Sequence, residues 1–243
     1  MLNGHTPANW TLTVFPHWQQ LFTSIDQVFS LLKSPAENLQ ENSRGTVVLI
    51  QHQGHQFIAK RSKRQERHVW AQITSLYRKG EGTRTLHNMA KLYELGLPVP
   101  EPVLILEKIR YGCVVASWSM YCYAEGDACT CADAPQIAAM LKQMHQHGWV
   151  HRDPHVKNFL KNAECLAIID CARARPWRSR RAQMYDVVLL NNCCPGSLVY
   201  YGITEADWWY RLAKTQNNLL QFWRRAKRAV NPWRYQNRRE TPE

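Results

Sequence analysis

Apolar residues recur every three or four positions in several parts of the chain, and this spacing predicts amphipathic helices. Such stretches cover residues 18–33, 69–77, 83–95, 135–147 and a C-terminal stretch over 204–235. Other stretches are rich in β-branched and aromatic residues, which favour strands. These stretches cover residues 46–51, 56–61, 103–106 and 111–123. The pattern predicts a mixed chain whose strands precede a mainly helical second half.

One part of the chain is rich in candidate chemistry. His151, Arg152 and Asp153 are followed by Asn158 and, after an apolar run, by Asp170. Transfer of a phosphate from ATP requires the protein mainly to orient a hydroxyl and to neutralise charge on the phosphates. Asp153 can accept or orient the proton of that hydroxyl, while Asn158 and Asp170 supply the hard oxygen atoms that magnesium prefers. The spacing H-R-D-x-x-x-x-N, with a later Asp, is that of the protein-kinase catalytic set.

Two short apolar runs lie between the last two of these residues. Residues 159–160 and 166–169 predict the strands of a hairpin, with 161–164 as its turn. A hairpin returns the chain to the end at which it started, so we expect Asn158 and Asp170 to lie at the same end.

This stretch resembles the kinase-like enzymes, and residues 44–192 are most similar to the bacterial lipopolysaccharide core kinases. That group comprises the Kdo and heptose kinases and the toluene-tolerance-type proteins. The passage Leu-Tyr-Glu-Leu-Gly-Leu-Pro-Val-Pro, which ends at Pro100, also resembles a passage of that family. The resemblance implies an α+β, two-lobed protein-kinase-like fold. The expected parts are an N-terminal helical extension at 1–39, a small β-rich lobe at 40–126, and a mainly helical lobe with a basic aromatic tail at 127–243.

The resemblance also implies the nucleotide-binding residues. Phe-Ile-Ala-Lys, which ends at Lys60, is similar to the strand whose lysine pairs with the α- and β-phosphates. A solvated strand-end lysine is the alternative. The family's glycine-rich loop is reduced to Gly45 before the first strand of that pair. Its helix glutamate is expected near Thr85 and His87, and Glu81, one turn earlier, would take that role if the helix begins sooner.

Three further residues are assigned within the catalytic loop and after it. In the family, the residues at the places of His151 and Arg152 hold the loop backbone. His155 stands where protein kinases have a lysine that touches the transferring phosphate, and a histidine can donate a similar hydrogen bond. A turn histidine beside a proline is the alternative reading. The helix that contains Asp186 resembles the one whose aspartate supports the catalytic loop.

Charge indicates an acidic partner. The formal net charge is +12 and the sequence pI is about 9.5, which suits a nucleic acid, an anionic membrane surface or a phosphorylated substrate. Five arginines within 173–181 suit phosphate groups, although a solvated loop is the alternative. The C-terminal stretch packs under the second lobe, rests on an anionic membrane, or does both. We expect no nucleic acid, because no recognised binding motif is present.

Eight cysteines occur without a C-x-x-C spacing. The first ten residues lack the charged and apolar regions of an export signal, and no run of about 18 apolar residues exists. We therefore expect a cytoplasmic protein, with peripheral contact at the inner membrane face, whose cysteines are reduced and mostly buried.

Together, the residues and the resemblance predict an ATP- and Mg²⁺-dependent kinase. The resemblance implies that its acceptor is an anionic glycolipid or phosphosugar, namely a Kdo or heptose hydroxyl of the lipopolysaccharide inner core. Two alternatives stay open: a compact protein serine/threonine kinase without an activation loop, and a pseudokinase that binds partners without chemistry. The poor glycine loop and the missing helix glutamate favour the pseudokinase, whereas the retention of Lys60, Asp153, Asn158 and Asp170 together favours an enzyme.

Overall fold

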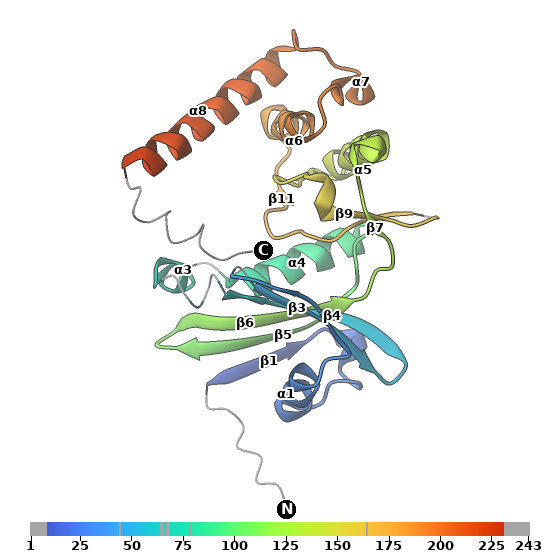
Figure 1. Cartoon of the computed structure of the whole chain (residues 1–243), viewed down its shortest axis with the longest axis vertical. Coiled ribbons are helices and arrows are strands. Elements are labelled where there is room, and N and C mark those ends of the chain that lie inside the picture. The colour runs from blue at the N-terminus through green and yellow to red at the C-terminus, as the bar shows by residue number, and fades with distance from the viewer. Residues whose placement is uncertain are drawn as a thin grey trace, which may run out of the picture. The chain divides into compact units, whose positions relative to one another are not determined.

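The computed structural model describes residues 9–43, 45–63, 66, 69–77, 79–163 and 165–230 (Figure 1). The chain divides into two compact units. Unit 1 comprises Met1–Cys129 and Lys157–Arg175, and unit 2 comprises Thr130–Val156 and Pro176–Glu243. The segment 157–175 thus groups with the N-terminal part of the chain. The lobe boundaries expected from the sequence stay a prediction.

Unit 1 is built on a six-stranded antiparallel sheet with the strand order β1-β5-β6-β4-β3-β2. The strands are β1 (Trp10–Val14), β2 (Glu37–Glu41), β3 (Gly45–His52), β4 (His55–Ser62), β5 (Pro102–Arg110) and β6 (Cys113–Cys122). The predicted strands at 46–51, 56–61, 103–106 and 111–123 are confirmed as β3, β4, β5 and β6.

Two tight hairpins fix the register of this sheet. The β3–β4 loop is Gln53-Gly54 and the β5–β6 loop is Tyr111-Gly112, and all four residues have positive φ. A two-residue loop with positive φ at both positions matches the right-handed twist of the paired strands. Because a one-residue slip would turn every side chain to the other face, these loops determine which residues of β4 and β6 face the candidate site.

The two faces of the sheet are covered by different helices. Figure 1 shows α1 (Ile25–Lys33) on one face and α4 (Glu81–Glu94) on the other, with α3 (Val69–Thr74) near one end of the sheet. The face toward α1 carries an aromatic core in which Trp18, Phe22 and Val28 pack against Phe57. Burial of these side chains fixes the N-terminal segment to the sheet.

The helix predicted over 18–33 is wrong in its first half. The chain forms a short 3-10 helix, η1 (Pro16–Trp18), and α1 begins only at Ile25. The hydroxyl of Ser24 accepts a hydrogen bond from the backbone N–H of Gln27, which is the arrangement of a helix N-cap. Residues 1–39 are also not wholly helical, because β1 and part of β2 lie there and pair with β5 and β3.

Unit 1 also contains the predicted hairpin. Strands β9 (Phe159–Lys161) and β10 (Leu166–Ile168) pair antiparallel, and β7 (Asp127–Ala128) pairs with the other edge of β9. The predicted turn residue Glu164 lies outside the described residues. The prediction of a hairpin at this place is confirmed.

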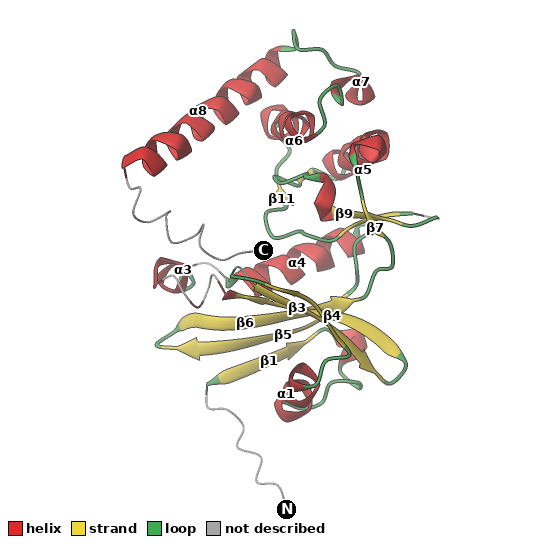
Figure 2. Ribbon diagram, in the orientation of Figure 1, coloured by secondary structure: helices red, strands yellow, loops and turns green. Residues whose placement is uncertain are grey.

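Unit 2 is mainly helical, and Figure 2 shows the contrast with the strands of unit 1. Its buried core combines residues of α6, α7 and α8, among them Met184, Val187, Leu198, Tyr210 and Ala213. Its elements are η2 (Cys131–Asp133), α5 (Ala134–Gln146), β8 (Trp149–Val150), α6 (Arg180–Cys193), α7 (Leu198–Tyr201) and α8 (Trp208–Val230), while η3 (Val156–Asn158) and β11 (Arg175–Pro176) span the junctions between units. The predicted helix at 135–147 is confirmed as α5. Residues 231–235 of the predicted C-terminal helix lie outside the described residues. The expected α+β fold is confirmed.

The expectation that all eight cysteines are reduced is wrong. Cys131 and Cys194 form a disulfide across a sequence separation of 63 residues. Cys131 opens η2, whose capping box joins Thr130 and Asp133, and Cys194 caps the C-terminal end of α6. The folding of unit 2 brings these two helix ends together, and no local spacing in the sequence reveals that pairing.

We predict that Phe22→Ala lowers the free energy of unfolding by about 3–5 kcal/mol, because it empties a packed aromatic site. Phe22 is 2% exposed, and its ring centroid lies 5.4 Å from that of Phe57. Urea unfolding followed by circular dichroism measures the loss. The matched control is Phe222→Ala, at a side chain that is 64% exposed, where a change within about 0.5 kcal/mol is expected. Equal losses in the two variants would contradict the assigned core.

Candidate active site

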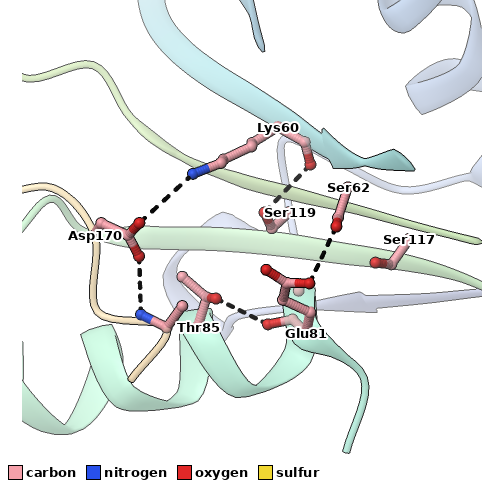
Figure 3. Close-up of a pocket in the computed structure, with 9 residues that line it drawn as sticks. Lys60, Ser62, Glu81, Thr85, Ser117, Ser119 and Asp170 are labelled. Carbon is pink, nitrogen blue, oxygen red and sulfur yellow. Dashed lines mark hydrogen bonds and ion pairs between the residues drawn. The ribbon is translucent and has the colours of Figure 1, made fainter. Parts of the chain in front are cut away.

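A small pocket lies between the sheet of unit 1 and α4. Side chains two positions apart on a strand point to the same face, so Lys60 and Ser62 of β4 face α4 together. Ser117 and Ser119 of β6 do the same, and Ser119 pairs in register with Lys60. The full lining is Lys60, Ser62, Glu81, Gly82, Thr85, Ser117, Ser119, Asp170 and Ala172 (Figure 3). The sequence-predicted Lys60, Glu81 and Asp170 therefore border one pocket.

Lys60 and Asp170 approach each other across this pocket (Figure 3). The Lys60 Nζ atom lies 3.9 Å from Asp170 Oδ2, and the two side chains are 45% and 34% exposed. A pair this exposed contributes only about 0–1 kcal/mol to stability. Asp170 Oδ1 accepts a hydrogen bond of 3.0 Å from the backbone N–H of Ala172. The pair therefore matters for where it places a cation and a carboxylate rather than for the energy of folding.

Asn158 and Asp170 lie at the same end of the β9–β10 hairpin. Phe159 pairs with Ile168, and the backbone N–H of Ile169 donates to the carbonyl of Asn158 at 3.0 Å. Asn158 thus directly precedes the paired strands and Asp170 follows them closely. One amide and one carboxylate oxygen are a donor set that fits Mg²⁺, which normally takes its remaining ligands from phosphates and water.

Glu81 is the first residue of α4, so the helix begins sooner than the predicted residue 83. Its Oε2 atom accepts a hydrogen bond of 3.1 Å from the Ser62 hydroxyl, two residues beyond Lys60 on β4 (Figure 3). Thr85 stands one turn later and donates its hydroxyl to the Glu81 carbonyl at 2.8 Å. The sequence predicted that Glu81 would take the role of the helix glutamate if the helix began before residue 83, and the helix does so. The pairing of Glu81 with Lys60 stays a prediction.

Gly45 begins β3, directly after the β2–β3 turn. Its backbone N–H donates to Asn42 Oδ1 at 3.1 Å. A Cβ atom at this position would lie 2.5 Å from the carbonyl oxygen of Arg61 on β4, so only glycine allows the close approach of the two strands. The close packing of β3 on β4 thus explains why position 45 is a glycine. The contact of Gly45 with nucleotide stays a prediction.

Hydroxyl groups are the part of the pocket that the sequence did not reveal. Ser117 is 1% exposed, and its Oγ atom has no hydrogen-bond partner among the described residues. A buried hydroxyl that faces a pocket is ordinarily satisfied by water or by a ligand. The signal in the sequence is the Ser-x-Ser spacing at 117–119 within a long apolar strand.

The catalytic-loop residues of unit 2 are organised around Asp186 of α6. Its side chain is fully buried and accepts hydrogen bonds from the backbone N–H of His151 at 2.7 Å and of Arg152 at 2.6 Å. The His145 ring of α5 lies 3.1 Å from the same carboxylate. The expected support of this loop by Asp186 is confirmed.

The loop backbone is strained at Arg152, whose φ is +65°. A non-glycine residue holds this left-handed conformation only where its surroundings fix it. The Asp186 carboxylate accepts the backbone N–H groups of His151 and of Arg152 itself, and the Arg152 guanidinium lies 5.9 Å from the centre of the Trp177 ring. The predicted role of Arg152 in the loop backbone thus has a direct geometric basis.

His151, Asp153 and His155 follow one another through short contacts. The backbone N–H of Asp153 donates to His151 Nδ1 at 3.3 Å, and the backbone N–H of His155 donates to the Asp153 carbonyl at 2.8 Å. His151 is fully buried, Asp153 is half-buried and His155 is exposed. His151 therefore belongs to the support of the loop, while Asp153 and His155 stay accessible for the roles predicted for them.

One family model covers both the pocket residues of unit 1 and the catalytic-loop residues of unit 2. The model of the lipopolysaccharide kinase (Kdo/WaaP) family matches residues 31–214, which include every candidate site residue. The chain belongs to this family. The resemblance seen in the sequence is thereby confirmed, and this lipopolysaccharide-kinase family member is an ATP-dependent kinase.

Solved structures share the fold of this family member. The structure of WaaP in complex with acyl carrier protein is similar with a TM-score of 0.54, at 15% identity, over 89% of this chain and 97% of that chain. A microcompartment-associated aminopropanol kinase is similar with a TM-score of 0.52, at 12% identity, over 77% of this chain and 83% of that chain. These likenesses establish a kinase-like fold and nothing more. A comparison with curated protein sequences found no match.

Helix α4 of this kinase also holds the segment that follows Asp170. Asn88 Nδ2 donates to the carbonyls of Cys171 at 2.8 Å and Ala174 at 2.7 Å, and Arg84 Nε donates to the carbonyl of Ala172 at 3.1 Å. Neither side chain was predicted from the sequence, since an Asn or Arg on a helix gives no sign of the distant carbonyl that it binds.

We predict that stability falls as the pH rises above about 9 and that Cys171 contributes to the fall. Burial, and secondarily the Asp170 carboxylate, raises the pKa of this thiol above its ordinary value of 9.0. The unfolded chain loses the proton above that pH while the folded chain keeps it, so the free energy of unfolding decreases with rising pH. Urea unfolding between about pH 8 and pH 10 should show a smaller decrease for Cys171→Ala. The control Cys165→Ala alters an exposed thiol, and identical slopes in both variants would contradict the assignment.

We predict that Asp186→Asn destabilises the catalytic loop. Each carboxylate oxygen of Asp186 accepts one backbone N–H, from His151 or Arg152. In the asparagine variant an NH₂ group replaces one of these oxygens and cannot accept a hydrogen bond, so the free energy of unfolding should fall by about 3 kcal/mol. Faster hydrogen exchange at the Arg152 amide would localise the effect. Asp207→Asn is the matched control, because the Asp207 side chain accepts the Tyr210 N–H at the start of α8, and a loss of about 1 kcal/mol or less is expected. An unchanged Arg152 amide would defeat the prediction.

Proposed function

We propose that this kinase transfers the γ-phosphate of ATP, with Mg²⁺, to a sugar hydroxyl of the lipopolysaccharide inner core, on Kdo or heptose. One observation carries the proposal: the phosphate lysine Lys60 and the carboxylate Asp170 border one pocket, in a chain that matches the Kdo/WaaP model over residues 31–214. The hairpin contact that puts Asn158 at the same end as Asp170 supports it.

The residues divide the work of the reaction. Asp153 accepts the proton of the sugar hydroxyl as its oxygen forms a bond to the γ-phosphorus, and the bond from that phosphorus to the bridging oxygen breaks, so ADP leaves. Lys60 binds the α- and β-phosphates. Asn158 and Asp170 would hold Mg²⁺, which neutralises phosphate charge when bound. Glu81 is proposed to orient Lys60, and His155 to donate a hydrogen bond to the transferring phosphate.

The exposed arginines support an anionic acceptor. All five arginines within residues 173–181 are exposed, and guanidinium groups match phosphate oxygens in pairs. The net charge of +12 also attracts an anionic acceptor, and it does so from a longer distance than the arginine side chains can reach. We propose that the acceptor is a phosphorylated sugar carried on a glycolipid at the cytoplasmic face of the inner membrane.

The two alternatives from the sequence predict different acceptors. A compact protein kinase would label a protein, and a pseudokinase would bind ATP and label nothing. The joint retention of Lys60, Asp153, Asn158 and Asp170 supports an enzyme over a pseudokinase, and Lys60 and Asp170 border one pocket.

We predict that Asp153→Asn lowers phosphate transfer about 100-fold or more, because an amide cannot accept the proton. Its affinity for ATP should stay within about threefold. The assay uses γ-labelled ATP and Mg²⁺ with purified lipopolysaccharide core beside a generic protein acceptor, and chelation by EDTA is the metal blank. The control is Asp26→Asn, an exposed carboxylate on α1. Label on the protein alone would establish the protein-kinase alternative, and label on neither acceptor, with ATP bound, the pseudokinase.

A further inference from the structure

Helix α8 buries only a narrow face against its neighbours in unit 2. Of the side chains along Trp208–Val230, those of Tyr210, Ala213 and Asn217 are almost completely buried, at 1%, 0% and 4% exposed. These residues are three and four positions apart and therefore share one face of the helix. Tyr210 and Ala213 join the core that α8 forms with α6 and α7.

Exposed large apolar side chains of α8 lie on the side opposite this packed face. We call them the aromatic stripe, which consists of Trp208 (67% exposed), Leu219 (56%), Phe222 (64%) and Trp223 (68%). Leu219, Phe222 and Trp223 are spaced i, i+3 and i+4, so they form one continuous face. Leu219 is about 200° around the helix axis from the buried Asn217. An amphipathic helix that turns its apolar face away from its own core marks a binding surface.

The charge of α8 has one sign. Its sequence contains six basic residues and no Asp or Glu. Arg224, Arg225 and Lys227 follow the stripe directly and are exposed, and the side chain of Arg228 lies outside the described residues. The partner of this surface must therefore accept large apolar side chains and carry negative charge at the same place.

An anionic lipid bilayer has both properties. Trp and Phe side chains enter the boundary between headgroups and acyl chains, while Arg and Lys side chains meet the anionic headgroups. Within the described residues, no helix is long and apolar enough to cross a bilayer, so α8 would lie on the surface. A second copy of this chain has the same positive charge and is less complementary.

We propose that α8 docks the kinase on an anionic bilayer, with the aromatic stripe inserted at headgroup depth. This inference deepens the proposed function and rests on it for one point, namely that the acceptor lies in the same membrane. Docking there confines the enzyme and a glycolipid acceptor to one surface, which raises the concentration of acceptor near the enzyme.

The first test is binding to vesicles. The full chain should sediment with vesicles of equal parts phosphatidylglycerol and phosphatidylcholine, less with phosphatidylcholine alone, and less as salt is raised. Phe222→Ser combined with Trp223→Ser should weaken binding about tenfold or more. Arg224→Gln with Arg225→Gln should weaken it about fivefold per charge.

The matched control is Trp70→Ser, because Trp70 is 78% exposed on α3 of unit 1. This variant should bind vesicles like the unaltered chain. Equal losses in Trp70→Ser and in the stripe variant, or no vesicle binding at all, would overturn the proposal. A dimer in solution that Trp223→Ser dissociates, without vesicle binding, would overturn it too, because a second copy would then cover the stripe.

The second test separates this inference from the proposed function. Turnover is measured on a water-soluble, deacylated core oligosaccharide and on the same core presented in vesicles. The stripe variant should keep its turnover on the soluble acceptor and lose about tenfold on the vesicles. Vesicle binding without turnover on either acceptor would end the proposed function and leave the docking surface standing, while a stripe variant whose turnover equals that of the unaltered chain on both acceptors would end the docking surface alone.

Discussion

The buried carboxylate of Asp186 is the constraint on which the catalytic loop depends. A charge without exposure is costly unless donors surround it, and here the backbone of the loop itself supplies two of them. The same bonds hold Arg152 in a left-handed conformation that a loop residue would otherwise leave. Helix α6 and the loop are therefore one structural unit, and the position of Asp153 follows from a residue far along the chain.

In unit 1 the site residues are positioned by the alternation of side chains between the two faces of β4 and β6. One face of these strands carries Phe57 into an aromatic core, and the other carries Lys60, Ser62, Ser117 and Ser119 toward α4. The two faces of the sheet therefore have different tasks. The aromatic face supplies the burial that stabilises the fold, while the polar face leaves the Ser117 hydroxyl without a hydrogen-bond partner among the described residues. The two tight hairpins keep that separation, because they prevent a slip of register.

The sequence predicted most of what depends on neighbouring residues. The β9–β10 hairpin and strands β3 to β6 are local patterns, and their prediction is confirmed. The catalytic-loop motif is local too, and the family resemblance based on it is confirmed. The helix over 18–33 failed because helical spacing of apolar residues does not show where a cap such as Ser24 begins a helix. The contacts of Asn88 and the Cys131–Cys194 pair depend on tertiary folding, and no spacing in the chain encodes them. The Ser-x-Ser spacing places Ser117 and Ser119 on one face of β6, but only tertiary folding brings Ser62 to the same pocket.

The disulfide makes a covalent ring of residues 131–194. The ring contains Asp153, Asn158, Asp170 and Asp186, whereas the six-stranded sheet with Lys60 lies outside it. Closing a loop of this length removes entropy from the unfolded chain worth about 4 kcal/mol. A reducing compartment does not maintain such a bond. In the reduced form, unfolding therefore gives more conformational entropy to the loop that carries the proposed base than it does in the oxidised form. Redox state would thereby act on one group of site residues and leave the lysine strand untouched.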